Sequence, residues 1–237
     1  MGDRSVLRWG LSAAGERASS VLGWLAGGVL GAAGVLRRGK PLHPKGVVYE
    51  ATLTTWGRGR QWGVPLLERG AELPCRVRVS RAMGLPAPLP DIHGVAVRLD
   101  GEPVDLLFAT TGTGLLTRYV LLLRRSDRAA MTTLMPLRTR SGPLQVRLSP
   151  QPAGAGRRSW VVSAGAPGRR RWVPFGRLDT AATPVRPDPD PPVRFDPVRN
   201  VPEGTGQYRW IALLRDPAYV LARRWSPPSR WRSRPGA

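Results

Sequence analysis

Cysteine and histidine are almost absent from this chain. Cys75 is the single cysteine among 237 residues, which excludes an internal disulfide framework and a zinc site built from cysteines. It lies in an alternating, strand-like run, so we expect a buried and unreactive thiol. The two histidines are His43 and His93. Without a His/Asp cluster at ligand spacing they cannot build the two-metal centre of a phosphodiesterase.

Acidic residues are also scarce. The chain has 37 Lys and Arg against 16 Asp and Glu, a net charge of +21, and such a charge first suggests a nucleic-acid or anionic-lipid partner. However, only Lys40 and Lys45 are lysines, and the basic residues are scattered outside Arg169–Arg171. No platform of interleaved aromatic and basic residues is present. We expect no specific nucleic-acid partner, and a basic nucleic-acid or lipid binder stays open as a minor alternative.

One long run lacks any charge, Ala18–Leu36. It is long enough to span a bilayer, and glycines spaced four apart from Gly23 suit helix pairing, although its glycines weaken helix formation. Two alternatives remain, a helix that spans or lies on a membrane and a glycine-rich arm packed on its own domain. Asp3 and Glu16 disfavour a secretory signal. We therefore expect a cytoplasmic protein, with membrane association through Ala18–Leu36 left open.

From His43 onward the pattern becomes period-two, which predicts short strands separated by Gly/Pro loops. The expected strands are Val47–Leu53, Cys75–Ser80, Gly94–Leu99, Val104–Thr110, Leu144–Leu148, Ser159–Ser163 and Arg171–Phe175. This spacing is typical of an all-β barrel or sandwich. A tight turn is expected at Asp100-Gly101. Residues 117–134 are left undecided between strand and helix, and the proline-rich residues 183–197 are expected to form an extended connector.

A helix is predicted over about 206–224, where apolar residues recur at three- and four-residue steps. Arg215 and Tyr219 stand four apart and share one face. A nearby guanidinium favours the phenolate over a phenol of pKa near 10, and a tyrosine phenolate is one of the protein ligands that haem iron accepts. On this spacing alone, a packing tyrosine beside a solvated arginine is the better interpretation.

The spacing does not stand alone, because residues 195–224 resemble the haem-catalase segment that carries the proximal tyrosine. The matching positions are Phe195, Pro197, Pro202, Arg215, Tyr219 and Arg224. His43-Pro44-Lys45-Gly46 resembles the distal histidine motif of the same family. Arg78-Val79-Ser80, residues 91–98 and residues 104–106 are similar to the strands that follow it. Four patches in the right order identify the chain as resembling a short, divergent member of the haem catalase superfamily.

This resemblance implies a mainly β (α+β) fold, a closed antiparallel barrel of catalase type with flanking helices and a C-terminal helix carrying the proximal tyrosine. We expect three regions: an arm with the Gly-rich apolar run at 1–42, the catalase-like haem-binding domain at 43–225, and a Pro/Ser/Arg-rich tail at 226–237 whose composition predicts disorder. It also implies haem b as cofactor, with Tyr219 as axial ligand and Arg215 keeping it anionic. His43 would be the distal acid–base group, suited by a pKa near neutrality, and Ser80 would orient it.

The resemblance assigns further cations to haem binding. Lys40 and Arg78 lie where the family keeps cations for the haem propionates, with Lys40 replacing an arginine, and Arg224 falls at another matching arginine. His93 is expected to be structural. The chain has Leu107–Thr110 where the family has a glycine and paired asparagines, one of which holds the peroxide.

We therefore expect peroxidase-like reduction of hydrogen peroxide or organic hydroperoxides, with weak catalase activity. The alternative is a catalase-fold scaffold without haem chemistry that acts as a binding protein. The oligomeric state stays open.

Overall fold

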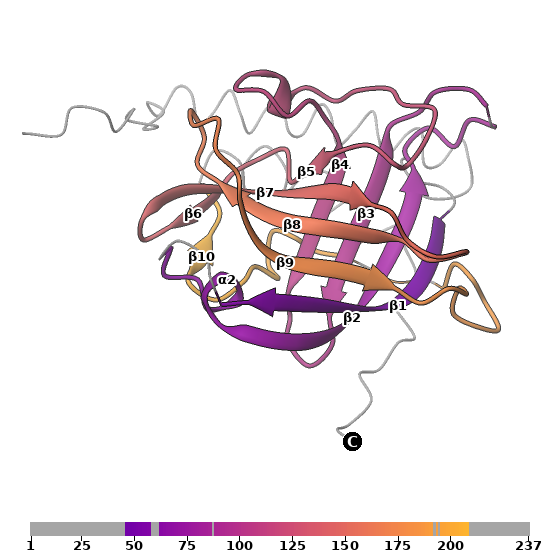
Figure 1. The fold of residues 1–237 in the computed structure, drawn as a ribbon, viewed down its shortest axis with the longest axis horizontal. Coiled ribbons are helices and arrows are strands. Elements are labelled where there is room, and N and C mark those ends of the chain that lie inside the picture. Colours follow the sequence, from indigo (N-terminus) through magenta and orange to yellow (C-terminus); the bar gives the residue numbers. More distant parts are fainter. Residues whose placement is uncertain (1–45, 58–61, 87, 192, 194, 209–237) are drawn as a thin grey trace, which may run out of the picture.

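The computed structural model describes residues 46–57, 62–86, 88–191, 193 and 195–208 (Figure 1). Nearly all of its regular structure is β. The strands are β1 (Gly46–Trp56), β2 (Gly70–Arg81), β3 (His93–Leu99), β4 (Asp105–Thr110), β5 (Met131–Thr132), β6 (Leu137–Thr139), β7 (Gly142–Gln151), β8 (Ser159–Gly165), β9 (Val173–Thr180) and β10 (Thr205–Gly206). The helical elements of this part are the four-residue α2 (Pro65–Glu68) and the 3-10 turn η1 (Thr117–Tyr119).

The sheet closes on itself. Neighbouring strands follow the order β7-β5-β4-β3-β2-β1-β9-β8, and a further pairing of β7 with β8 completes a barrel of antiparallel strands. Closure leaves no free edge along the ring, which is how an all-β domain satisfies its backbone hydrogen bonds. The expected closed antiparallel barrel is therefore confirmed. The ring also contains a long-range pairing between β1 and β9, with Ala51 opposite Thr180.

Alternation along each strand sends one side-chain set into the barrel and the other outward. On β2, Val77 and Val79 are buried in the core, whereas Arg76, Arg78 and Ser80 belong to the outer face. Val95 and Val97 on β3 lie opposite them. The interior is thus filled by β-branched and aromatic side chains such as Phe175, which is 1% exposed. A barrel of this size is a packed core.

The connector at 181–191 covers the first half of β1, where β9 does not reach. Val48 donates its N–H to the carbonyl of Pro189 at 2.8 Å and accepts from Val185 at 2.9 Å. Residues 181–191 form an irregular connector with several bends rather than the extended one expected over 183–197, and they satisfy backbone groups that β1 would otherwise leave unpaired.

Two expectations need correction. The predicted helix does not begin at Gly206, because Thr205 and Gly206 form β10 and pair with Thr139 and Arg138 of β6; the residues beyond 208 lie outside the described part. The connection between β3 and β4 is wider than a tight turn, since Leu99 N–H bonds the carbonyl of Val104.

Residues 117–134 contain η1, irregular loop and the two-residue β5. Within the described ranges, no helix is long and apolar enough to cross a bilayer, and Ala18–Leu36 lies outside them.

Candidate functional site

Two of the seven predicted site residues, Arg78 and Ser80, lie in the described part of the chain, both on β2. The other five lie outside it, so their positions stay predictions. They are His43, Lys40, Arg215, Tyr219 and Arg224. The structure therefore describes only the part of the candidate site that lies on the barrel.

The register places Ser80 in a row of small residues across the outer face of β1–β4. Ser80 lies between Gly46 of β1 and Gly94 of β3, and Gly94 lies opposite Ala109 of β4. Ser80 is 8% exposed. Because its neighbours carry no side chain beyond a methyl group, the row is a shelf of small residues with one hydroxyl, and the Arg78 guanidinium covers its Gly46 end. The resemblance expects the family's asparagine at Ala109 or Thr110, and neither residue carries an amide.

Arg78 lies in the next row along β2, between Val48 and Ala96. Its guanidinium is held by the carboxylate of Asp190: Nε donates to Oδ1 at 2.7 Å and Nη2 donates to Oδ2 at 2.9 Å. The backbone N–H of Gly46 donates to the same Oδ2 at 2.7 Å. Bidentate pairing of this kind fixes orientation as well as charge. The cation that we expected to bind a propionate already has a carboxylate partner.

Gly46 is needed where it stands. A Cβ at this position would lie 2.4 Å from the Cζ atom of Arg78, so a larger residue would have to displace the guanidinium from its pair with Asp190. The connector, β1 and β2 therefore meet at one polar junction formed by Gly46, Arg78 and Asp190.

The third row of the outer face anchors the segment that leads toward Tyr219. The side chain of Asp105 on β4 is fully buried. Its Oδ1 accepts from Nε of Arg98 at 2.7 Å, and its Oδ2 accepts from Nη2 of Arg98 at 2.6 Å. Asp105 also accepts the N–H of Asp196 at 2.8 Å and the side-chain amide of Asn200 at 2.7 Å. The Arg98 guanidinium lies 5.2 Å from the centre of the Phe195 ring. The Phe-x-Pro motif is thus fixed to the β3–β4 hairpin.

His93 makes contacts of the structural kind that we expected. It is buried, and its Nε2 lies 3.0 Å from the carbonyl oxygen of Arg124. Since a carbonyl only accepts, the imidazole donates there. Its backbone N–H donates to Oγ1 of Thr110 at 3.2 Å. These bonds tie the end of the barrel to the loop at 121–124.

A second cluster, on the opposite part of the barrel, stacks two arginines on one ring. The Cζ atoms of Arg118 and Arg147 lie 4.6 Å and 4.8 Å from the centre of Trp172. Arg118 is 0% exposed and donates to the carbonyls of Gly114 and Arg169 at 3.0 Å and 2.7 Å. Burial lowers the pKa of both guanidiniums, and for Arg147 the nearby charge of Arg118 lowers it further. This cluster fixes two loops to the barrel.

Cys75 faces the core and is 2% exposed. Burial, helped by Asp100, raises the pKa of its thiol to about 12. The described residues contain no group of three or more His, Cys, Asp or Glu that could hold a metal ion.

Sequence reasoning missed Asp190, and it missed the role of Asp105 and of Arg118. Asp190 stands in a proline-rich stretch without periodicity, and its partner lies far away in the chain. The one usable signal is the scarcity of acids: with 16 Asp and Glu against 37 cations, a carboxylate has many available partners.

The fold has counterparts among solved structures. A fungal catalase matches with a TM-score of 0.53 and 12% identity over 78% of this chain and 59% of its own. Catalase A from Saccharomyces cerevisiae matches with a TM-score of 0.53 and 10% identity over 78% of this chain and 60% of its own. The chain thus spans about three-fifths of these catalases. No family model and no curated protein matches the sequence. The barrel is catalase-like in fold.

Proposed function

We propose that this protein binds one b-type haem against the outer face of β1–β4 and reduces hydrogen peroxide or organic hydroperoxides. The supporting observation is the placement of Arg78, Ser80 and the small-residue shelf on one face of a catalase-like barrel. These are the described residues that the resemblance assigned to this task.

The described residues suit such a group. A planar macrocycle needs a flat surface, which Gly94, Ala96 and Ala109 provide on adjacent strands. It needs a cation for its propionates, and Arg78 stands beside this surface on β2. Tyr219, which lies outside the described residues, would supply an oxygen ligand to its iron. One feature departs from this fit, because Asp190 holds the Arg78 guanidinium.

When bound, the haem would supply the redox-active iron for peroxide reduction. The chain's own residues then have separate tasks. His43 takes a proton from the peroxide and returns it to the leaving oxygen, a role that contributes about 10²–10⁴-fold in rate. Ser80 accepts or donates a hydrogen bond that orients this imidazole. Arg215 stabilises the Tyr219 phenolate.

The missing amide at Ala109 or Thr110 argues for peroxidase rather than catalase turnover. A polar group beside the histidine would support charge that develops on the peroxide oxygens, and a methyl group cannot do so. Catalase turnover also requires a second peroxide to be held and oxidised in the same pocket. A peroxidase takes electrons from a separate donor and depends less on that pocket.

A second candidate is a catalase-fold binding protein without haem chemistry. The observation that favours it is the bidentate Arg78–Asp190 pair, whose carboxylate takes the contacts that a propionate would need. In this case the shelf is a surface for another ligand, and the connector stays closed over β1.

Haem titration of the purified full chain separates the two candidates. The parent and the matched control Tyr208→Phe should each take up one haem per chain and show a Soret band with phenolate ligation. Tyr219→Phe should lose at least about tenfold in affinity, because the axial bond is removed. Uptake and spectra that are equal in Tyr219→Phe and the parent would remove the axial assignment. A parent that takes up no haem would favour the binding protein.

Activity assays complete the test. His43→Ala should lower peroxidase turnover by about 10²-fold or more while haem loading is unchanged. Equal turnover in His43→Ala and the parent would show that His43 is not the acid–base group.

A further inference from the structure

A strip of large apolar side chains is held out in solvent between β4 and β5. We define the leucine strip as Leu116, Tyr119, Val120, Leu121 and Leu123. Leu116 is 81% exposed, and Val120, Leu121 and Leu123 are 50%, 44% and 53% exposed. Single exposed leucines are ordinary on protein surfaces, but five exposed apolar side chains within residues 116–123 mark an interaction surface.

The strip is fixed in place by hydrogen bonds, so its exposure is a property of an ordered loop. The buried Arg118 in its middle donates to the carbonyls of Gly114, Ala166 and Arg169. Thr132 donates its hydroxyl to the carbonyl of Arg118 at 3.1 Å. The loop backbone thus holds the leucines outward, whereas Arg118, the charged residue within 116–123, points into the protein.

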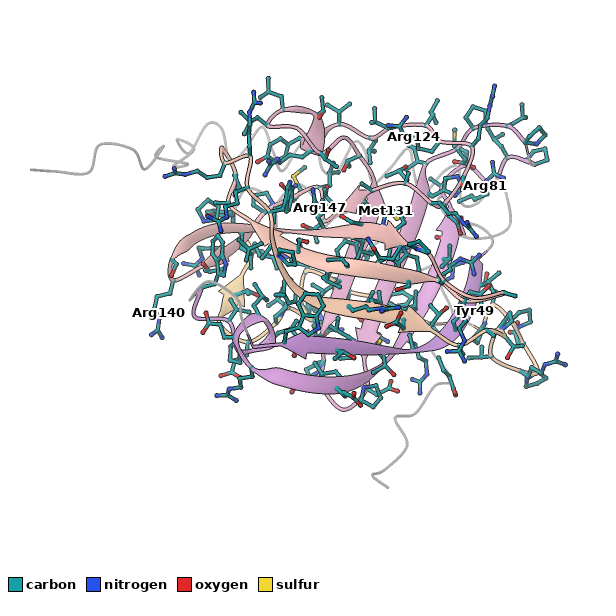
Figure 2. The ribbon with its side chains drawn as sticks, viewed as in Figure 1. Tyr49, Arg81, Arg124, Met131, Arg140 and Arg147 are labelled. Atoms are coloured by element: carbon teal, nitrogen blue, oxygen red, sulfur yellow. The ribbon has the colours of Figure 1, made fainter. Side chains whose placement is uncertain are left out.

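A second loop adds apolar surface next to the strip. Asp91 and Arg124 exchange backbone hydrogen bonds at 2.9 Å and 2.8 Å, which joins the β2–β3 loop to the end of the strip. That loop exposes Met83 and Leu89. Figure 1 shows both loops along the upper edge of the barrel, and Figure 2 labels Arg81 and Arg124 there. The apolar surface therefore extends along one edge.

Arginines border this edge. Arg124, Arg125 and Arg128 directly follow the strip and are exposed. The neighbouring acids are already engaged: Asp127 pairs with Arg158 at 2.9 Å, and Asp91 is buried with three backbone N–H donors. The border is therefore positive. Exposed leucines with arginines beside them are the composition of segments that lie in the headgroup region of anionic membranes.

We propose that this edge of the barrel docks on an anionic lipid surface, with the leucine strip entering the interface and Arg124, Arg125 and Arg128 contacting lipid phosphates. The positive charge of this edge favours an anionic lipid surface over a second copy of the chain. A second copy of the chain would bring another +21 toward an edge that is itself positive, and this repulsion opposes self-association. The docking surface adjoins the Ala109 end of the shelf, since the Leu122 N–H bonds the carbonyl of Thr110 at 2.9 Å, but the proposal does not depend on haem.

Flotation of the full chain with vesicles tests the proposal. The parent should float with vesicles of phosphatidylcholine and phosphatidylglycerol and stay unbound with phosphatidylcholine alone. Leu121→Ser/Leu123→Ser keeps every charge and should weaken binding at least about tenfold. Arg124→Ala/Arg125→Ala should do the same, whereas Arg138→Ala/Arg140→Ala, which removes equal charge on β6 and the turn after it, should bind like the parent.

If the serine variant binds as tightly as the parent, the strip does not enter the membrane and the proposal fails. If both arginine pairs have equal effects, binding reflects net charge alone and the proposal also fails. Urea midpoints of the variants show that they are folded, since the replaced leucines are half-exposed.

A site-specific probe gives an independent readout. Because the native Cys75 is buried with a raised thiol pKa, a single added cysteine can be labelled with an environment-sensitive dye. Leu123→Cys should show a blue shift on anionic vesicles. Arg140→Cys should not, because Figure 2 places Arg140 at the far side of the barrel from Arg124. Equal spectra for the labelled Leu123→Cys with and without vesicles would overturn the proposal.

Discussion

Replacement of Asp105 by asparagine should be the most informative change in the barrel. The carboxylate accepts four hydrogen bonds, two of them from Arg98, and its side chain is 0% exposed. Asparagine has the same shape but would turn an NH₂ group toward donors. Removing one partner of a buried ion pair costs about 3–5 kcal/mol. Since the Arg98 side chain is 24% exposed and keeps some hydration, we expect a loss near the lower limit, about 3 kcal/mol.

Urea unfolding and amide hydrogen exchange measure the two consequences. Asp105→Asn should lower the free energy of unfolding by that amount and should also increase exchange at residues 196–207, because Asp196 and Asn200 lose their acceptor. The matched control is Asp179→Asn. It breaks the pair of Arg177 and Asp179, whose side chains are 51% and 39% exposed, so it should cost less than about 1 kcal/mol. Equal losses in the two variants, or unchanged exchange at 196–207, would refute the reasoning.

Further outcomes are expected at three positions. Cys75, with a thiol pKa of about 12, should not react with a thiol reagent at pH 8 until the protein unfolds; labelling of the native protein at the unfolded rate would contradict its burial. Burial alone would raise the pKa of Asp91, but three backbone N–H donors and Arg81 outweigh it and lower this pKa. The carboxylate therefore stabilises the fold above its ordinary pKa near 4, and this stabilisation is lost as pH falls through the lower folded pKa. Asp91→Asn should flatten urea midpoints measured from pH 6 to pH 2, and a slope equal to that of the parent would exclude Asp91 as its source. If the proposed haem binds, Ala109→Asn should raise oxygen evolution from hydrogen peroxide without changing haem loading; unchanged evolution would show that the amide is dispensable.

The barrel could be predicted because strands that bury one face show a period-two pattern of apolar residues in the sequence. Val77 and Val79 alternate with Arg76 and Arg78, and the structure sends the two sets to opposite faces. The same alternation is enough to predict that Arg78 and Ser80 share one face of their strand. β5 could not be found this way, because a strand of two residues is too short to alternate.

Other features of the structure cannot be predicted from the local sequence. Arg118 lies inside an apolar run and is fully buried, although charged side chains normally stay exposed. Its burial is explained by carbonyls from distant loops, at Ala166 and Arg169. Asp190 is likewise defined by a partner on another element. The helix start at Gly206 was wrong because pairing with β6 outweighs the apolar spacing that follows.

The order in which the barrel closes bears on its synthesis. β1 is made early, but one of its two neighbours is β9, and Ala51 meets Thr180 only when most of the domain has been translated. At about 5–20 residues per second, the β9-facing edge of β1 waits on the order of ten seconds with its N–H and C=O groups unpaired. An unpaired strand edge is a template for pairing with other chains. The nascent chain is therefore expected to depend on holding chaperones until β9 leaves the ribosome.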